Sequence, residues 1–186
     1  METPENKEQL EIQITDARPE DAEGINNVYY KTWLDTYPNK EVGITVDDVE
    51  DSFKDSFTED HLNQVRERII NNPESTKRLV AKEGDLVVGV CVAVRNEDNN
   101  QLRTIYVLPE FQGKGIGRKL WDEVKSIFDP TKDTIVHVAT YNTKTVEFYK
   151  SLGFEDTGKR FTDEKFRMKS GSILPQMEMA IKAIEN

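Results

Sequence analysis

The chain has 186 residues, of which 36% are hydrophobic and 32% are charged, and the apolar residues gather in short periodic runs. This composition excludes a disordered chain and predicts a globular protein of ordinary domain size. The formal net charge of -10 disfavours nucleic-acid partners, because binding to a phosphate backbone depends on clustered Lys and Arg.

The apolar runs and the single cysteine favour a cytoplasmic protein with no membrane partner. The first residues contain neither a basic nor an apolar targeting pattern, and the longest apolar run, residues 86–94, is too short to span a bilayer. Cys91 lies within that run, and we expect it to be a small buried residue rather than a nucleophile. The oligomeric state stays open, with a homodimer among the alternatives.

A polar segment precedes the first predicted strand. Residues 1–9 are polar and include Pro4, and we expect them to form a flexible tail. Apolar residues then alternate over residues 10–14, as in a strand with one buried face. Neither a linker nor an internal repeat follows, so residues 10–186 are predicted to form a single domain.

Helices are predicted after this strand. Pro19 and the acidic residues that follow it open a helix, because proline and carboxylates are favoured in a first helical turn. The helix should end before Pro38, and its apolar residues recur at helical spacing, at Ile25, Val28, Tyr29 and Trp33. The acidic residues 41–60 contain a weak pattern for a short helix, and residues 62–69 contain a clearer one.

The middle of the chain predicts a hairpin followed by a third strand. Residues 79–82 and 86–94 are expected to be strands joined by a tight turn, in which Gly84 can take a positive φ angle. The third strand covers residues 102–107 and ends before Pro109, because proline lacks an N–H for the ladder. A glycine-rich loop then leads into an amphipathic helix.

The last part of the chain alternates strands and helices. Residues 134–139 predict a strand, and residues 143–152 predict a helix that Gly153 closes. Two late strands are expected near residues 154–161 and 177–181. The order of elements indicates an α/β (α+β) protein.

The loop after the third strand predicts an anion-binding site. It consists of Gln112, Gly113, Lys114, Gly115, Ile116, Gly117 and Arg118. The N–H groups of a first helical turn lack intrahelical partners and attract anions, and glycines let a pyrophosphate approach the backbone. Walker A and GxGxxG loops are excluded, because Arg118 lies where each of them requires glycine.

Two ordered motifs resemble those of the GNAT acetyltransferase superfamily. Gln112, Gly115 and Gly117 match its [QR]xxGx[GA] motif, and residues 142–154 are similar to its second signature, NxxxxxFYxxxGF. The resemblance covers roughly residues 11–182. It implies a GNAT fold with a central mixed, mostly antiparallel sheet of six to seven strands. That sheet would be splayed between the fourth and fifth strands and flanked by about four helices.

The resemblance also implies an N-acetyltransferase that moves the acetyl group of acetyl-CoA directly to an amine in a ternary complex, without a metal. By this resemblance residues 112–118 would bind the diphosphate, and the backbone of Ile105 and Val107 would pair with the pantetheine arm. Asn142 would contact the cofactor, and it also suits the N-cap of the following helix. The acceptor would be a small-molecule or peptide amine: a polyamine, an amino sugar, a small amine or a protein N-terminus.

Tyr149 and His137 are the candidate catalytic residues. Tyr149 matches the family tyrosine that faces the departing sulfur, and a phenol with a pKa of about 10 can donate a proton at neutral pH. His137 lies where enzymes resembling ribosomal-protein N-terminal acetyltransferases have a glutamate base, and imidazole is also a competent base. The alternatives are core packing for Tyr149 and a structural role for His137. Glu110 and His61 are expected at the surface.

The acceptor site is predicted near the end of the first helix. Trp33 and Tyr37 could offer aromatic faces to a cation and Asp35 a charge partner, although Trp33 also suits the core. Two other functions stay open. A GNAT-shaped acyl-CoA sensor would keep the loop without needing Tyr149, and an interaction protein using residues 41–60 would leave the loop unexplained.

Overall fold

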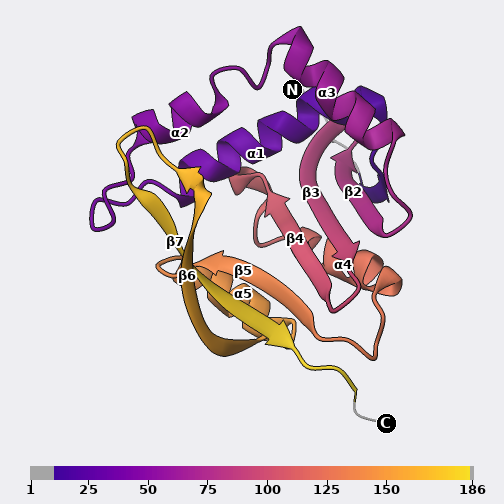
Figure 1. Cartoon of the computed structure of the whole chain (residues 1–186). Coiled ribbons are helices and arrows are strands. Elements are labelled where there is room, and N and C mark those ends of the chain that lie inside the picture. Colours follow the sequence, from indigo (N-terminus) through magenta and orange to yellow (C-terminus); the bar gives the residue numbers. More distant parts are fainter. Residues whose placement is uncertain (1–10, 185–186) are drawn as a thin grey trace, which may run out of the picture.

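The computed structural model describes residues 11–184, and the predicted tail of residues 1–9 lies outside them. The described chain folds into one sheet with helices on both sides (Figure 1). Its elements are β1 (Ile12–Asp16), α1 (Ala22–Thr36), α2 (Val46–Phe53), α3 (Glu59–Ile70), β2 (Thr76–Glu83), β3 (Leu86–Arg95), β4 (Asn100–Val107), α4 (Ile116–Val124), β5 (Thr134–Ala139), α5 (Thr143–Ser151), β6 (Glu155–Arg167) and β7 (Ile173–Ile181). Each predicted element is present, but the two late strands are longer than predicted.

Local hydrogen bonds explain where the first helices begin. The backbone N–H of Asp48 donates to Thr45 Oγ1 at 3.2 Å, and the N–H of Thr45 donates to Asp48 Oδ2 at 2.9 Å. This reciprocal pair satisfies two donors that a helix start leaves without partners, so α2 begins at Val46. The weak helical pattern in residues 41–60 is thereby confirmed. Thr58 accepts from the N–H of His61 and caps α3 in a similar way.

The described residues form a seven-stranded sheet in the order β1-β2-β3-β4-β5-β7-β6. Neighbouring strands are antiparallel except β4 and β5, which are parallel. Within the described chain, β4 and β5 pair only at Asn100–Thr134, Gln101–Ile135 and Leu102–Val136. Beyond Leu102 the two strands separate. The predicted mixed sheet, splayed between its fourth and fifth strands, is confirmed.

Asn100 holds the two strands together where they meet. Its side chain is fully buried, and its Nδ2 donates to the carbonyl oxygens of Asp129 at 2.8 Å and Lys132 at 3.2 Å. Nδ2 also lies 3.3 Å from Thr134 Oγ1, and the Asn100 Oδ1 accepts from the N–H of Asp129 at 3.0 Å. One buried amide therefore joins the start of β4 to the loop before β5.

Helices α1–α3 gather on one side of the sheet, and α4 and α5 lie on the other (Figure 1). Val28 of α1 and Leu120 of α4 are both fully buried in the main hydrophobic cluster. A second cluster joins α1 and α2 to the ends of β5 and β7, and includes Tyr37, Val49 and Leu174. The five α-helices between residues 11 and 184 are all too short or too polar to cross a bilayer.

Candidate functional site

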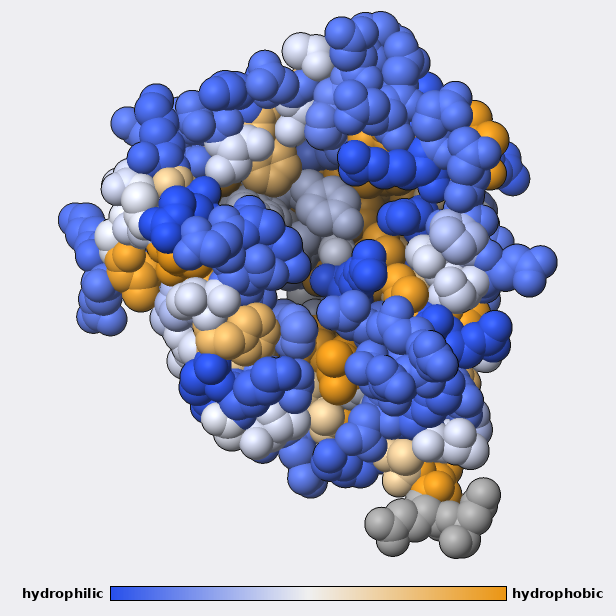
Figure 2. All heavy atoms as spheres, viewed as in Figure 1, coloured by the Kyte–Doolittle hydropathy of each residue, from blue (hydrophilic) through white to orange (hydrophobic). Residues whose placement is uncertain are grey.

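The separation of β4 from β5 opens a cavity of about 600 Å³. Figure 2 shows a hollow in this region of the surface, surrounded largely by hydrophilic side chains. The cavity wall includes the end of α1, the second half of β4, the loop of residues 111–118, the end of β5 and most of α5. Because α1 and α5 lie on opposite sides of the sheet, the cavity reaches both sides through the gap between the strands.

The edge of β4 turns backbone groups toward this gap. The N–H of Leu108 donates to the carbonyl oxygen of Val88 on β3 at 2.9 Å. Because bonding directions alternate along an antiparallel pair, the N–H groups of Ile105 and Val107 point away from β3. The carbonyl oxygen of Val107 accepts from Gln112 Nε2 at 3.0 Å. Both predicted backbone positions thus lie on the edge of β4 that β5 leaves open.

The loop of residues 112–118 has the geometry of an anion cradle. Gly113 and Gly115 adopt left-handed φ angles of 77° and 78°, which side chains rarely adopt. A Cβ atom at either glycine would meet no other atom within 4 Å, so the space outside the loop is open. Gly115 is the N-cap of α4, and no side chain caps the first turn of that helix. Its N–H groups remain available to an anion.

Gly117 and Arg118 also hold α4 against α5. A Cβ at Gly117 would lie 3.0 Å from Cζ of Phe148, so the absence of a side chain lets the two helices approach closely. The Arg118 guanidinium donates to both the carbonyl oxygen and Oγ of Ser151, each at 3.1 Å. These packing contacts join distant segments, and the sequence motif alone did not predict them.

Lys144 is a cavity residue that sequence reasoning missed. It comes from α5, and its ammonium group donates to Gln112 Oε1 at 2.5 Å across the mouth of the cavity. Lys114 instead extends over the ring of Phe111, with Nζ 4.5 Å from the ring centre. Asn142 Oδ1 accepts from the N–H of Thr145 at 3.1 Å, so the expected N-cap of α5 is present beside the cavity.

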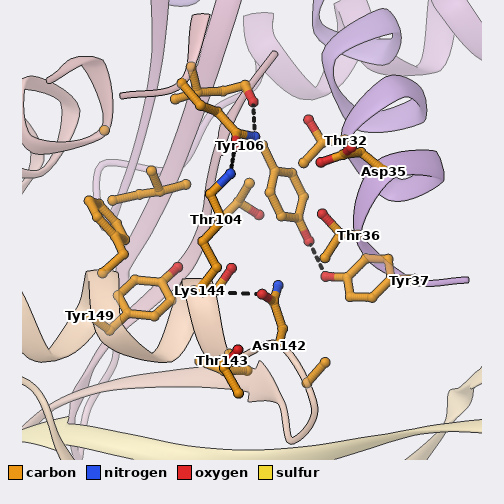
Figure 3. Close-up of a pocket in the computed structure, with 18 of the residues that line it drawn as sticks. Thr32, Asp35, Thr36, Tyr37, Thr104, Tyr106, Asn142, Thr143, Lys144 and Tyr149 are labelled. Atoms are coloured by element: carbon orange, nitrogen blue, oxygen red, sulfur yellow. Dashed lines mark hydrogen bonds between the residues drawn. The ribbon is translucent and has the colours of Figure 1, made fainter. Parts of the chain in front are cut away.

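Tyr149 is a buried residue whose hydroxyl group points into the cavity (Figure 3). Its side chain packs against Phe148 and Phe154, and the residue is 5% exposed. Burial raises the pKa of Tyr149 well above the usual range of a phenol, since the phenolate would be desolvated. The hydroxyl group therefore keeps its proton at neutral pH.

The end of α1 forms the polar wall of the cavity opposite Tyr149. Figure 3 shows Thr32, Asp35 and Thr36 on one face of α1, directed toward Tyr106 of β4. The hydroxyl groups of Tyr37 and Tyr106 lie 2.8 Å apart, and burial raises the pKa of Tyr37 to about 12. Within the described chain, the buried Oγ1 of Thr32 has no hydrogen-bond partner.

Of the three predicted acceptor residues, Asp35 and Tyr37 line the cavity, and Trp33 lies behind them. The Trp33 ring packs against Tyr37, Phe53 and Phe166, with ring centres 4.7, 5.4 and 6.1 Å away. The core position that the sequence also allowed for Trp33 is the one observed.

His137 lines the cavity. Its side chain lies on one face of β5, and the side chains of the buried residues Val136 and Val138 lie on the other face. The edge of its ring meets Phe161, with the ring centres 4.7 Å apart, and its Nε2 lies 3.5 Å from Glu178 Oε2. Burial lowers the pKa of His137 below its usual range, and the Glu178 carboxylate partly opposes that shift. His137 is consequently neutral at pH 7.

Of the other two titratable candidates, both expected at the surface, Glu110 is exposed. The Glu110 carboxylate is 3.9 Å from Lys31 Nζ, and both side chains are about half exposed. His61, on α3, is partly buried. Across residues 11–184, no group of three or more His, Cys, Asp or Glu side chains is arranged to hold a metal ion.

Comparison with known families gives one clear match. The family profile described as an acetyltransferase (GNAT) domain matches residues 33–170. No curated protein sequence matches the chain significantly.

Solved structures of similar fold come from several organisms. The PaiA N-acetyltransferase from Thermoplasma acidophilum, in complex with coenzyme A, is 22% identical with a TM-score of 0.68, covering 93% of this chain and 99% of its own. The yncA protein from Salmonella typhimurium, with its cofactor acetyl-CoA, is 22% identical with a TM-score of 0.61, covering 95% and 96%. The ribosomal-protein-S18-alanine N-acetyltransferase from Escherichia coli is 15% identical with a TM-score of 0.62, covering 95% and 97%. At these identities the similarity concerns the fold.

Proposed function

Because the chain belongs to the GNAT acetyltransferase family, we propose that it transfers the acetyl group of acetyl-CoA directly to an amine within a ternary complex. The observation that carries the proposal is the cavity between β4 and β5. It joins the loop of residues 112–118, on one side of the sheet, to the polar wall of α1 on the other. Donor and acceptor could therefore enter from opposite sides and meet beside Tyr149.

Three features of the chain fit acetyl-CoA. The open space beside Gly113 and Gly115, together with the uncapped start of α4, suits the diphosphate. The backbone of Ile105 and Val107 offers the edge of β4 to the amides of a pantetheine arm. The volume of the cavity lies in the usual range for sites that enclose a small molecule. PaiA and yncA, which share the fold, were solved with coenzyme A and acetyl-CoA.

Two groups on the chain would assist the departure of the thiol. Acetyl-CoA, when bound, supplies an activated thioester. The Val107 N–H would donate a hydrogen bond to the thioester oxygen as negative charge develops there, which is the usual task of an oxyanion hole. The Tyr149 hydroxyl would donate to the sulfur. A thiol has a pKa of about 8.5, below that of this buried phenol, so Tyr149 stabilises the thiolate mainly through the hydrogen bond.

His137 would remove the proton that keeps the acceptor unreactive. An amine with a pKa of about 10.4 is protonated at pH 7, and deprotonating it costs about 4 to 5 kcal/mol. Burial keeps His137 neutral, so its free ring nitrogen can accept that proton. Asp35, on the cavity wall, would attract the cationic form of the amine before the proton leaves. The acceptor can be a small molecule or a peptide amine.

A panel of amines tests the proposal. The protein is mixed with acetyl-CoA and polyamines, amino sugars, small primary amines or peptides in turn, and the release of free thiol is followed. Thiol release that requires one class of amine, with the acetylated amine identified by mass spectrometry, supports the proposal. If acetyl-CoA binds but no amine is acetylated, the chain is an acyl-CoA-binding module instead.

A further inference from the structure

His137 separates the cavity from a second hollow on the protein surface. It contributes to the walls of both, and the outer hollow is also lined by Asp133, Ile135, Lys159 and Glu178. The His137 side chain is 28% exposed and that of Glu178 is 14% exposed. Because His137 and Glu178 are directly paired residues of β5 and β7, the sheet fixes their relative position.

Glu178 is itself held by β6. Its Oε2 lies 3.0 Å from Lys159 Nζ, and its Oε1 accepts from Thr157 Oγ1 at 3.3 Å. The same Oε2 lies 3.5 Å from His137 Nε2, a buried nitrogen without a hydrogen-bond partner in the described chain. A buried ring nitrogen aimed at a fixed carboxylate is one small movement away from a hydrogen bond, and such contacts often tighten when substrate binds.

We propose that Glu178 is a positioning residue for His137, and that the two residues carry the acceptor's proton from the cavity to the surface hollow beside Lys159. The inference rests on the proposed function, because it takes His137 as the base. It adds a residue and a route that neither sequence motif contains.

The proton balance follows from the two ring nitrogens. A hydrogen bond from Nε2–H to Glu178 selects the tautomer in which Nδ1 keeps its lone pair. Nδ1 accepts the proton of the acceptor amine before the amine attacks, and the ring becomes an imidazolium. The Glu178 carboxylate stabilises that cation, takes the proton from the buried Nε2 and releases it to water in the surface hollow. The ring is then neutral and carries the acceptor's proton on Nδ1, and proton exchange with water re-forms the tautomer with hydrogen on Nε2.

Four charged groups near the ring affect its titration in addition to burial. Glu178 on β7 and Asp163 on β6 favour the imidazolium, and Lys159 and Lys165 on β6 oppose it. Burial lowers the pKa of His137, and among the charges the Glu178 carboxylate counteracts this shift most strongly. Removing Glu178 should therefore lower the pKa of His137 further, whereas removing Lys159 should raise it.

The two histidines of the chain allow a direct test by NMR. The pH titration of the His137 ring protons is recorded for the wild type, Glu178→Gln and Lys159→Met, with the signals of His61, which lies on α3, assigned separately. We expect the pKa of His137 to fall in Glu178→Gln and to rise in Lys159→Met. Lys125→Met, which removes a similarly exposed lysine paired with Asp122, is the matched control and should leave the titration of His137 unchanged.

Opposite shifts from two neighbouring substitutions cannot come from general loosening of the fold. If the His137 titration is the same in Glu178→Gln as in the wild type, the inference is overturned, whatever the activity. In the enzyme assay we expect kcat/KM of Glu178→Gln to fall about 10-fold or more at pH 7, toward the loss seen on removing a general base. If the NMR shifts occur but the pH profile of His137→Ala matches the wild type, His137 is not the base and the relay is also refuted. The rest of the proposed function stands in that case.

Discussion

Removing the Asn100 side chain should weaken the joint between β4 and β5 and lower the free energy of unfolding. In the wild type the Asn100 amide bonds to the carbonyl oxygens of Asp129 and Lys132 and to the N–H of Asp129. Asn100→Ala leaves these three groups without that partner. A buried polar group without a partner costs about 1 to 3 kcal/mol. Because these partners are only part-buried and water can reach some of them, we expect a total loss of about 2 to 4 kcal/mol.

Urea denaturation measures this loss, with the m-value as a check that the unfolded state is unchanged. Asn99→Ala is the matched control, because Asn99 is adjacent in the chain and its Oδ1 accepts from Asn96 Nδ2 in the same turn. That variant should lose less than about 1 kcal/mol. An equal loss in the two variants would refute the assignment of Asn100 as the joint. If Asn100 is the joint, Asn100→Ala should also bind acetyl-CoA more weakly, because β4 and β5 are then less firmly held together at the end of the gap.

Three further substitutions test the residues around the cavity. Gly115→Val should abolish acetyl-CoA binding in calorimetric titration, because the valine side chain fills the space beside the N-terminus of α4. Gly158→Val is the control, because Gly158 on β6 has a similar φ of 81° and an open Cβ position. It should lower the free energy of unfolding by a similar amount but leave the affinity for acetyl-CoA unchanged. Equal affinities of the two glycine variants for acetyl-CoA would show that the loop of residues 112–118 does not bind the donor. Tyr149→Phe should keep donor affinity and lower kcat by roughly 10²- to 10³-fold, the range for removing one hydrogen-bond donor to a developing charge. A steady-state kcat within about twofold of wild type would show that Tyr149 has only a packing role. In the pH profile of kcat/KM, activity should be lost as the pH falls through the pKa of His137, because the protonated ring cannot act as a base. Since burial lowers that pKa, the acidic limb should lie below about 6.5, and it should disappear in His137→Ala.

The sequence predicted the elements well wherever a local signal exists. Gly84 has the expected positive φ of 59° between β2 and β3, and Gly153 has a φ of 99° after α5. Helix α2 had a weak apolar pattern, yet Thr45 and Asp48 cap it in a way that four consecutive residues determine. The late strands extend beyond the predicted ends because pairing between β6 and β7, rather than apolar alternation, sets their length.

The walls of the cavity were predicted less completely, because residues far apart in the sequence meet there. Helical spacing gave the face of α1 that carries Trp33, but not that Phe166 would cover that ring. Lys144, Tyr106 and Glu178 carry no motif of their own, and each matters through a partner at least 32 residues away. Cross-strand pairing and helix packing decide such partners, and neither can be deduced from one sequence alone.

Amide hydrogen exchange resolved at single residues tests the central claim, that the open edge of β4 binds acetyl-CoA. The N–H groups of Ile105 and Val107 point into the gap, whereas those of Thr104 and Tyr106 face β3 and serve as internal references. On addition of acetyl-CoA, exchange at Ile105 and Val107 should slow, while the change at Thr104 and Tyr106 should be smaller. Unchanged exchange at Ile105 and Val107, at acetyl-CoA concentrations that support turnover, would contradict the account.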